Sequence, residues 1–422
     1  MSAGLAAARP APARPVAERH HIGYVLSLFP SYDETFILRE IKALSERGVR
    51  LTIFSLRNDR QAVVQEDARP FLEATRHAGY FSLDVLAATV RALVRRPVEV
   101  TSLVWLVLRG VWRQPELLLR SLVMLPKAFR FAEIAAEEGI DHLHAHWATY
   151  PATVALVMSR LTGLSWSFTC HAHDIFLNPS LLAEKLERAE FVLTCTGDNK
   201  RHLESLSPAA RDKVQVSYHG LDLRLFRPAP RPLADGPPSI LAVGSLLECK
   251  GFDILIEACA RLLRQGVDFS VTIAGGGPLE ASLREAVTRA GLDGRVRLTG
   301  YVTQKDLIPL YQQADIFVLP AVLEMHWGIP NVLVEALACG LPVVTTALPS
   351  LPELVQDGRE GLVAANRDPE DLARKVGRLI QEPALRRAMG RAGRQRVESS
   401  FDIERTIESV VLPLVGRSLV AL

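Results

Sequence analysis

Short apolar runs alternate with helical stretches along most of the chain, and this alternation limits the possible folds more than any other feature. Residues 22–28 and 49–56 are apolar runs of strand length, with a predicted helix at about 36–46 between them. Two strands joined through a helix run parallel, and parallel sheets are covered by helices on both faces. The pattern predicts an α/β fold built from βαβ units. Further strands are predicted at 140–145, 164–170, 191–195 and 214–218.

A proline-rich stretch at 226–238 separates two sets of these units. It holds five prolines in thirteen residues, a composition typical of a linker. Apolar runs after it predict a second parallel sheet, with strands at 240–243, 269–274, 296–298, 316–319 and 343–344. A chain of 422 residues is also too long for a single hydrophobic core.

These observations predict five segments. We expect a disordered tail at 1–20, an N-terminal Rossmann-like domain at 21–225 with a helical insertion at 84–138, the linker at 226–238, a C-terminal Rossmann-like domain at 239–400, and a C-terminal helix at 401–422 that packs back on the N-terminal domain. The tail is rich in alanine, proline and arginine and lacks the continuous apolar region of a signal peptide.

Composition narrows the class of protein. The formal net charge of +2 argues against a dedicated nucleic-acid binder. The five cysteines include no C-x-x-C pair, which favours a reducing cytoplasm over a disulfide scaffold or a zinc site. No run of 18 uninterrupted apolar residues exists, so we expect no membrane-spanning helix.

The helical insertion combines basic and apolar side chains. Between Arg91 and Arg130, eight basic residues stand against two acidic ones, interleaved with Trp105, Trp112 and many aliphatic residues. This combination favours peripheral contact with the inner face of the cell membrane, through residues 91–130. A helical pair that buries its apolar side in the domain core is the alternative.

A strand, a loop and a helix at 316–340 form the strongest candidate for a binding site. Pro330 is placed to open the helix and Gly340 to end it. The unpaired N–H groups of such a helix start, here around Asn331 and Val332, attract an anion such as a diphosphate. Glu335, about one turn further on, is suited to accept hydrogen bonds from ligand hydroxyls.

Two other strand ends carry polar groups. His171, His173 and Asp174 follow the strand at 164–170, and residues at the carboxyl end of a parallel strand face the ligand crevice. They are candidates for contacting a sugar, and two histidines with a carboxylate leave a metal site open as the alternative. Lys250 lies in the loop after the strand at 240–243, where an ammonium can neutralise phosphate oxygens. Glycines at 275–277 allow close approach of backbone to a ligand.

The order of motifs resembles the retaining glycosyltransferases of family 4, and within them the exopolysaccharide or colanic-acid type. The matching segments are FPSYDETFILREIKAL (29–44), HLHAHWATYPATVALVMSRLTG (142–163), SFTCHAHDIF (167–176), CTGDNKRHL (195–203), YHGLDLRLF (218–226), ECKGFDILIEACARL (248–262), IAGGGPLEASL (273–283), LTGYVTQKDLIPLYQQADIFVLP (298–320) and GIPNVLVEALACGLPVV (328–344).

The resemblance implies a GT-B fold, in which two Rossmann-like parallel-sheet domains face a cleft. The N-terminal domain would bind the acceptor, and the C-terminal one the nucleotide-sugar donor. The acceptor would be a saccharide or lipid-linked saccharide. No cofactor and no metal are expected, because a helix N-terminus and basic side chains take the place of a metal at the diphosphate.

Roles carry over from the family residue by residue. Glu335 matches the glutamate that binds the ribose, and Lys250 the lysine on the diphosphate. His171 matches the histidine near the donor sugar, whereas Gly300, Tyr301 and Val302 fall where the nucleobase packs. We take His171, Lys250 and Glu335 as the catalytic candidates. The remaining binding candidates are Thr35, His173, Asp174, Ser245, Gly300, Tyr301, Val302, Glu324, Trp327, Pro330, Asn331 and Val332.

Departures from the family pattern keep a second hypothesis open. Trp327 stands where the family has an acidic residue eight positions before Glu335, and Glu324 lies three residues earlier. Ser245 stands where the family has an arginine, whose hydrogen bond to a phosphate is worth about 1.5–3 kcal/mol. The chain is therefore either an active glycosyltransferase or a catalytically impaired relative that serves as a scaffold in polysaccharide assembly. An epimerase of the same fold fits the motifs less well, and a dehydrogenase fits least, since the first loop lacks G-x-G-x-x-G.

Overall fold

The computed structural model of the chain describes residues 20–31, 34–58, 66–80, 82–113, 115–229, 236–325 and 328–415. Two compact units emerge from the contacts between residues. The first contains Met1–His146 and Tyr150–Trp166, and the second contains Trp147–Thr149 and Ser167–Leu422. The predicted disordered tail lies almost entirely outside the described residues. Two of the five linker prolines (Pro230 and Pro232), Trp327 and the last seven residues of the predicted C-terminal helix also lie outside them.

The first sheet has seven strands in the order β3-β2-β1-β4-β5-β6-β7. Its strands are β1 (His21–Leu28), β2 (Arg50–Arg57), β3 (Thr75–His77), β4 (His142–His146), β5 (Ser165–Cys170), β6 (Val192–Thr194) and β7 (Val214–Val216). The pairs run parallel, for example with Tyr24 of β1 opposite both Ile53 of β2 and His144 of β4. The connecting helices are α1 (Thr35–Glu46), α5 (Tyr150–Thr162), α6 (His173–Phe176), α7 (Leu182–Arg188) and α8 (Gly197–Leu206).

The second sheet has six strands in the order β10-β9-β8-β11-β12-β13. They are β8 (Ser239–Val243), β9 (Ser270–Ala274), β10 (Val296–Leu298), β11 (Ile316–Leu319), β12 (Val343–Thr346) and β13 (Gly361–Ala364). The helices around it are α9 (Phe252–Arg264), α10 (Glu280–Arg289), α11 (Gln304–Gln313), α12 (Asn331–Ala338) and α13 (Pro369–Gln381). Buried side chains from one face of the strands pack with α9 and α13, for example Ile273 and Val318 with Leu255 and Leu379. The other face has its own buried cluster, which includes Phe317, Tyr311 and Leu333.

The two sheets share one topology. In each, the first strand of the set lies beside its second strand on one side and its fourth on the other, so the strand order reverses between β1 and β4 and between β8 and β11. In open α/β sheets, ligands bind beyond the carboxyl ends of the strands at this reversal. The loops after β1, β4, β8 and β11 are therefore the places to look for a site.

The predicted architecture of two Rossmann-like parallel sheets is confirmed. Two short strands, β3 and β13, were not predicted. The structure also corrects one detail of α12, since the helix begins at Asn331 and Pro330 precedes it as the N-cap residue, with an extended ψ of 121°.

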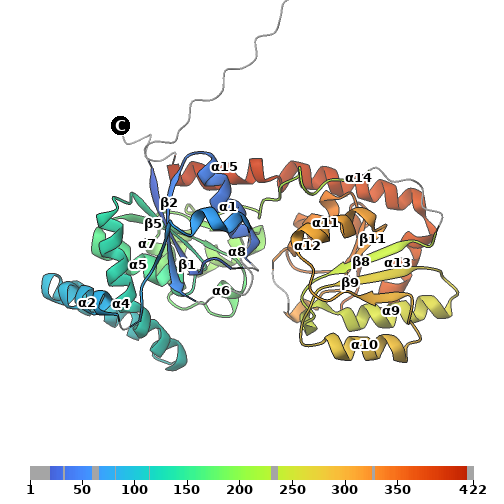
Figure 1. Cartoon of the computed structure of the whole chain (residues 1–422), viewed down its shortest axis with the longest axis horizontal. Helices are drawn as coiled ribbons and strands as arrows, with labels where there is room; N and C mark the ends of the chain where they lie inside the picture. Colours follow the sequence, from blue (N-terminus) through green and yellow to red (C-terminus); the bar gives the residue numbers. More distant parts are fainter. Residues whose placement is uncertain are drawn as a thin grey trace, which may run out of the picture. The chain divides into compact units, whose positions relative to one another are not determined.

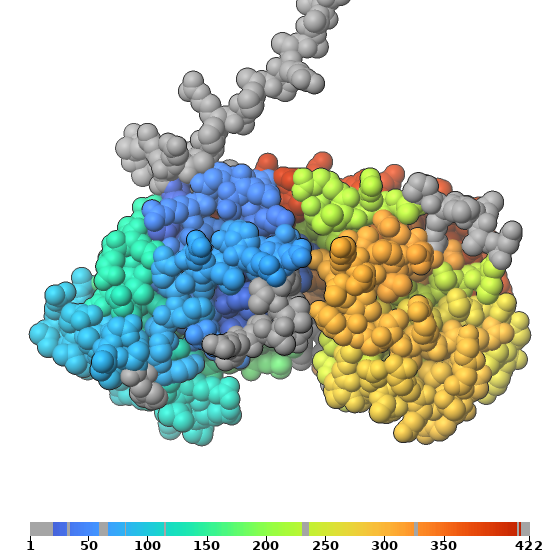
Figure 2. Space-filling view, in the orientation of Figure 1, coloured from blue at the N-terminus to red at the C-terminus, as the bar shows by residue number. Residues whose placement is uncertain are grey.

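The helical insertion forms three helices, α2 (Leu83–Arg95), α3 (Pro97–Val111) and α4 (Pro115–Glu137). Figure 1 shows α2 and α4 extending beyond the sheet, and Figure 2 shows the same residues at the surface. Large apolar side chains are exposed there, including Trp105 at 66 % and Trp112 at 63 %. Lys127 does not belong to this surface, since it is buried and its Nζ donates to the carbonyl oxygen of Leu56 at 2.6 Å.

Two helices, α14 (Pro383–Ser400) and α15 (Ile403–Val415), end the described chain (Figure 1). The junction between them pairs with the segment after β7, where Leu221 donates to Phe401 at 2.8 Å and accepts from Ile403 at 3.0 Å. Gly220 fits closely here, because a Cβ would lie 2.2 Å from Thr406 Oγ1. None of the described helices is both long enough and apolar enough to cross a bilayer.

Candidate functional site

The loop after β8 carries the predicted phosphate-binding lysine. Gly244 leaves the strand with φ at 158°, and Ser245 is exposed. Lys250 ends the short helix η3 (Glu248–Lys250), and its stem lies along Gly244, where a Cβ would be 3.5 Å from Lys250 Cδ. Burial lowers the pKa of Lys250, because an ammonium withdrawn from water loses hydration. A phosphate oxygen beside it would compensate for that loss.

Three consecutive glycines hold this loop against the nucleobase candidates. A Cβ at Gly275 would lie 1.9 Å from the carbonyl oxygen of Gly244, so no larger residue fits there. The amide of Gly275 donates to the carbonyl of Gly300 at 3.0 Å, and Gly276 lies against the backbone of Tyr301. Tyr301 is 61 % exposed, and Val302 is half-buried. The structure thus brings the loop of Ser245 and Lys250 together with Gly300 and Tyr301.

Glu335 is held by a residue that the sequence did not single out. It is buried within α12, and Tyr311 of α11 donates from its hydroxyl to Glu335 Oε2 at 2.9 Å. The same hydroxyl lies 3.4 Å from the carbonyl oxygen of Val332. A tyrosine 24 positions earlier in the chain gives no sequence signal of this pairing, because only the packing of α11 against α12 creates it. The carboxylate therefore has a fixed orientation.

Glu324, the candidate for the missing acid, lies on the surface. Asn366 Nδ2 donates to its Oε1 at 2.9 Å, and Arg367 Nε lies 3.6 Å from its Oε2. The Asn366 side chain also accepts from the amide of Leu323 at 3.0 Å. These contacts tie the loop after β11 to the segment after β13. The candidate Trp327 lies outside the described residues.

His171 stands directly after β5, at the carboxyl edge of the first sheet, and is buried. Its Nδ1 lies 3.1 Å from Nε2 of His219, in the segment after β7. Nδ1 of His219 in turn lies 3.3 Å from Oδ1 of Asn331, the first residue of α12. The structure therefore connects the predicted donor-sugar histidine to the predicted diphosphate helix through His219, which the sequence marked only as part of the matching segment YHGLDLRLF (218–226).

Asp174 supports the backbone around His171. It is buried, and its two oxygens accept from the amides of Ala148 at 2.7 Å and His171 at 3.0 Å. Burial raises the pKa of Asp174, and the two amides act in the opposite direction. Because both oxygens are engaged by backbone, we infer that Asp174 positions His171 and does not itself contact a ligand. His173, beside it, is exposed.

Lys185 is a second buried support of the same loop. Its ammonium lies at hydrogen-bonding distance from the carbonyls of Ala148, Thr149 and Ser180, at 2.5, 3.1 and 2.9 Å. Burial lowers its pKa to about 7, and the charge of Asp174 acts in the opposite direction. The residues that follow β4 are thus held by Lys185, which donates to their carbonyls, and by Asp174, which accepts from the amide of Ala148.

Trp147 directly precedes the residues that Asp174 and Lys185 hold. Its φ of 78° lies in the left-handed region, which costs a residue other than glycine about 1–3 kcal/mol. Its amide donates to Thr169 at 2.9 Å, and its ring centroid lies 4.4 Å from that of His171. Strained backbone of this kind is concentrated at functional sites. The sequence gives no indication of this strain, because the identity of a residue as tryptophan does not reveal its backbone φ.

In the first unit, the candidate Thr35 begins α1, and its Oγ1 lies 3.4 Å from Arg39 Nη2. Deeper in the same unit, Glu40 of α1 accepts from the Tyr24 hydroxyl at 2.8 Å and lies 2.9 Å from His146 Nε2. Burial opposes ionisation of Glu40, but the charge and hydrogen bond of His146 outweigh it and hold its pKa at about 2.

Two groups among the described residues have the donor atoms for a metal ion. One is His171, Cys195 and His219, and the other is Glu40, His144 and His146. The group suggested by the sequence, His171 with His173 and Asp174, is not one of them. The expectation that no metal serves the diphosphate remains a prediction.

Comparisons with known proteins give matches to both halves of the chain. Residues 34–225 match the family model Glycosyltransferase Family 4, and residues 237–382 match the model Glycosyl transferases group 1. WcaL of Escherichia coli (strain K12), named as a glycosyltransferase of colanic acid biosynthesis, is 27 % identical over 425 residues, covering 93 % of this chain and all of WcaL. AmsK of Erwinia amylovora, named as an amylovoran biosynthesis glycosyltransferase, is 36 % identical over 194 residues, which is 45 % of this chain and 48 % of AmsK.

A solved structure supports the fold. Anabaena Alr3699/HepE in complex with UDP aligns with a TM-score of 0.70 over 96 % of this chain and 100 % of that one, at 17 % identity. At this identity the likeness shows the fold alone, and it confirms the GT-B prediction.

Proposed function

The chain belongs to the glycosyltransferases of group 1 and family 4, and from this premise we propose that it moves a sugar from a nucleoside diphosphate sugar to a saccharide acceptor with retention of configuration. The observation that carries the proposal is the placement of Glu335. It lies one turn into the helix at the strand reversal of the second sheet, buried and oriented by Tyr311. A fixed carboxylate there is suited to accept the two hydroxyls of a ribose.

The neighbouring groups fit the other parts of such a donor. The diphosphate would lie at the start of α12, where the first amides of the helix lack intrahelical partners, and against the ammonium of Lys250. The exposed ring of Tyr301 offers a surface for the base. Alr3699/HepE, a protein of the same fold, was solved in complex with UDP, which is in keeping with a nucleotide-sugar donor.

The transfer itself would follow a front-face route. The acceptor hydroxyl attacks the anomeric carbon from the side on which the diphosphate leaves, so the carbon–oxygen bond to phosphate breaks as the new glycosidic bond forms. The departing phosphate oxygen takes the hydroxyl proton. Lys250 and the helix start stabilise the charge that grows on the leaving group, and His171, held by Asp174 and packed against Trp147, positions the sugar.

The second candidate function is a scaffold of reduced activity. Ser245, where the family has arginine, is exposed and has only a short hydroxyl to offer a phosphate. Because the site is exposed, an arginine would fit without being buried. Ser245→Arg should strengthen donor binding by about one to two orders of magnitude if serine is a loss, since one charge-assisted hydrogen bond is worth about 1.5–3 kcal/mol. A decrease would show that serine is adapted to a different donor.

The names of the relatives suggest where such an enzyme acts. Two of them, WcaL and AmsK, are named for the biosynthesis of colanic acid and amylovoran. We therefore place this chain in exopolysaccharide synthesis, with a lipid-linked saccharide as acceptor and work at the inner face of the cell membrane.

The surface of α2 and α3 supports contact with that membrane. Exposed Trp105 and Trp112 share these helices and the turn after them with exposed arginines at 95, 96, 109 and 113. Apolar side chains beside positive charge suit a bilayer with anionic headgroups. In a flotation assay the protein should rise with vesicles that contain anionic lipid, and the double change Trp105→Ala with Trp112→Ala should weaken this. Equal recovery with neutral and anionic vesicles would reject the proposed attraction between the arginines and anionic headgroups.

Calorimetric titration with UDP, GDP and other nucleoside diphosphates, followed by hydrolysis of the matching sugar donors, tests the enzyme proposal. We expect one nucleotide to bind and its sugar donor to be turned over. If no nucleotide binds at millimolar concentration, the scaffold hypothesis replaces it.

A further inference from the structure

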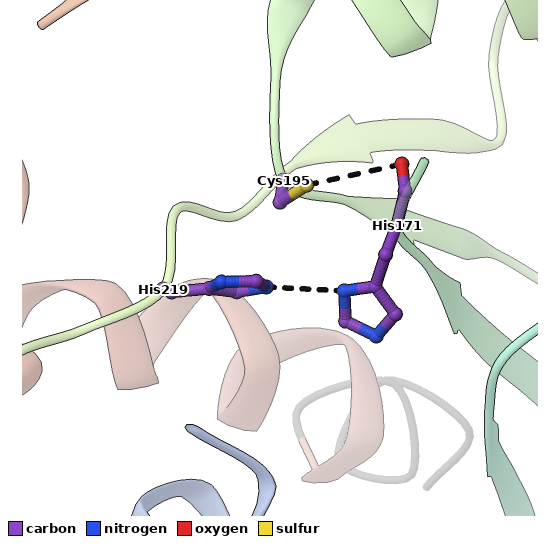
Figure 3. Close-up of side chains that lie close together, drawn as sticks. All are labelled: His171, Cys195 and His219. Atoms are coloured by element: carbon purple, nitrogen blue, oxygen red, sulfur yellow. Dashed lines mark hydrogen bonds between the residues drawn. The ribbon is translucent and has the colours of Figure 1, made fainter. Parts of the chain in front are cut away.

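Three side chains that commonly bind transition metals meet at the carboxyl edge of the first sheet. His171 directly follows β5, Cys195 directly follows β6, and His219 follows β7 by three residues. These strands are neighbours in the sheet. The ligand atoms of the three residues all lie within 4.8 Å of one another (Figure 3). Because the positions are set by adjacent strands and not by one flexible loop, the three groups already lie near one another, with the Cys195 thiol directed at the carbonyl oxygen of His171 at 3.9 Å.

The spacing of the two imidazoles is close to that of a zinc site. His171 Nδ1 lies 3.1 Å from His219 Nε2. Two nitrogens bound to one tetrahedral Zn²⁺ at about 2.0–2.1 Å are about 3.3–3.4 Å apart. The rings therefore need to separate by only a few tenths of an ångström, on the order of thermal motion, for an ion to replace the hydrogen bond between them.

The outer partner of His219 leaves the correct nitrogen available. Nδ1 of His219 faces the amide oxygen of Asn331 at 3.3 Å, and that oxygen can only accept. The proton therefore sits on Nδ1, and Nε2 directs its lone pair towards His171. Metal-bound histidines almost always donate their other N–H to an oxygen in this way. On binding, the proton of His171 moves from Nδ1 to Nε2, which faces away from His219 in Figure 3.

Cys195 supplies the third ligand. The thiol is buried and receives a hydrogen bond from Asn199 Nδ2 at 3.5 Å. Burial, and next to it the charge of Asp174, raises the pKa of Cys195 to about 12. A bound dication reverses this balance and releases the thiol proton. An adjoining cavity of about 10 Å³, lined by Cys195, His219 and Asn331 among others, has roughly the volume needed for one water molecule as a fourth ligand.

We propose that His171, Cys195 and His219 form a binding site for a divalent metal ion of borderline softness, with zinc as the expected ion. Two imidazoles and a thiolate favour zinc over magnesium or calcium, which prefer oxygen. The ion would hold His171 through Nδ1 and leave its Nε2 as a fixed hydrogen-bond donor. The use of this Nε2 donor in sugar transfer rests on the proposed function. The binding of the ion does not.

Metal binding is tested on the whole chain after treatment with a chelator. Titration with Co²⁺ should give one ion per chain, visible-range bands typical of tetrahedral cobalt, and a near-ultraviolet band from sulfur-to-cobalt charge transfer. Zn²⁺ should displace the cobalt. Cys195→Ser should remove the sulfur band and weaken zinc binding by roughly 100-fold or more, since the loss of even an outer-shell partner costs about 10–100-fold. Cys249→Ser, at the half-buried cysteine, is the matched control and should leave both unchanged.

Other outcomes would overturn the proposal. They are the absence of cobalt or zinc binding, a bound ion without the sulfur band, and binding that survives Cys195→Ser but is lost in Glu40→Gln, which would move the ion to the cluster of Glu40, His144 and His146. His219→Ala is a second variant in case Cys195→Ser does not fold, as judged by circular dichroism. Nucleotide titration of the metal-free protein stays independent, so failure of this proposal and failure of the glycosyltransferase proposal remain distinguishable.

Discussion

The carboxyl edges of the two sheets have the same strand order but keep their functional groups in place by different means. Around the first sheet, Asp174, Lys185 and Glu40 are charged or ionisable groups withdrawn from water, each engaged by backbone or side-chain partners. Around the second, glycines press two loops together, while Ser245 and Tyr301 are exposed and Lys250 is only half-buried. The first edge is built from buried polar contacts. The second combines close backbone packing with more exposed side chains, apart from Glu335, which is buried against Tyr311.

The two lysines show what this difference means. Lys185 lies against three carbonyl oxygens and supports the residues after β4, whereas Lys250 ends a short helix in the loop after β8 and is half-buried. A buried polar group costs stability when its partners are removed, and an open one costs little. Substitutions at the first edge should therefore act on folding, and substitutions at the second on activity.

The largest effect is expected at Lys185. Lys185→Met leaves three carbonyls without their donor and should lower the free energy of unfolding by about 3 kcal/mol or more, since each buried group left without its partner costs about 1–3 kcal/mol. Urea unfolding followed by circular dichroism measures it. A loss of less than about 1 kcal/mol, typical of a surface site, would break the contrast between the edges.

Glu335 is expected to give the next largest effect, on activity. Glu335→Ala removes the acceptor for two ribose hydroxyls and should lower kcat/KM by about 100-fold or more, since hydrogen bonds to charged groups are worth about 1.5–3 kcal/mol each. Tyr311→Phe keeps the carboxylate but removes the hydroxyl that orients it, and should cost about 5–15-fold. Steady-state kinetics of both variants, with melting temperatures as the folding control, tests the order. Equal losses with unchanged melting temperatures would mean that Tyr311 does more than orient Glu335, whereas a lowered melting temperature of Tyr311→Phe would mean that it acts through the fold.

Lys250 should give a smaller effect on activity and hardly any on folding. Lys250→Met retains the apolar stem along Gly244 and removes one charge-assisted contact to the diphosphate, so kcat/KM should fall by about 10–100-fold. The same urea experiment should show a change in unfolding free energy below about 1 kcal/mol. A stability loss as large as that of Lys185→Met would show that the second edge is also built from buried charge.

The smallest effect concerns pH and Glu40. With a pKa of about 2 in the folded state against 4.5 otherwise, Glu40 is ionised in both states above pH 4.5 and contributes its full stability there. As the pH falls from 4.5 towards 2, the unfolded chain binds a proton that the folded chain does not, so this stability is lost, by about 1.4 kcal/mol per pH unit at most. Glu40→Gln should flatten the pH dependence of urea unfolding between pH 5.5 and 3.5. An unchanged slope would mean that other carboxylates govern it.

Most strands could be predicted because each is a run of buried apolar residues. Of the two that were not predicted, β3 and β13, the first shows why such a prediction fails. β3 consists of Thr75, Arg76 and His77, half-buried or exposed at the sheet edge, so it has no apolar run to detect. Lys185 and Lys127 look like surface lysines in the sequence, because only tertiary packing places a carbonyl or a tyrosine ring at their ends.

The site was predictable as far as local motifs reach. Glu335, Lys250 and His171 stand beside strand ends or helix starts that the sequence marks. The partners that orient them could not be predicted from local motifs. Tyr311, Trp147 and His219 come from other elements, and their contacts depend on how those elements pack. Glu324 illustrates the same limit, because its hydrogen bond to Asn366 spans 42 positions.

The uneven burial of the five cysteines has a practical use. Four are buried, and Cys249 alone is partly accessible, directly beside Lys250. A thiol-reactive dye added to the native protein should therefore attach once per chain, at the loop proposed to receive the diphosphate. Its fluorescence would report the arrival of a nucleotide in real time, with no residue of the natural chain replaced.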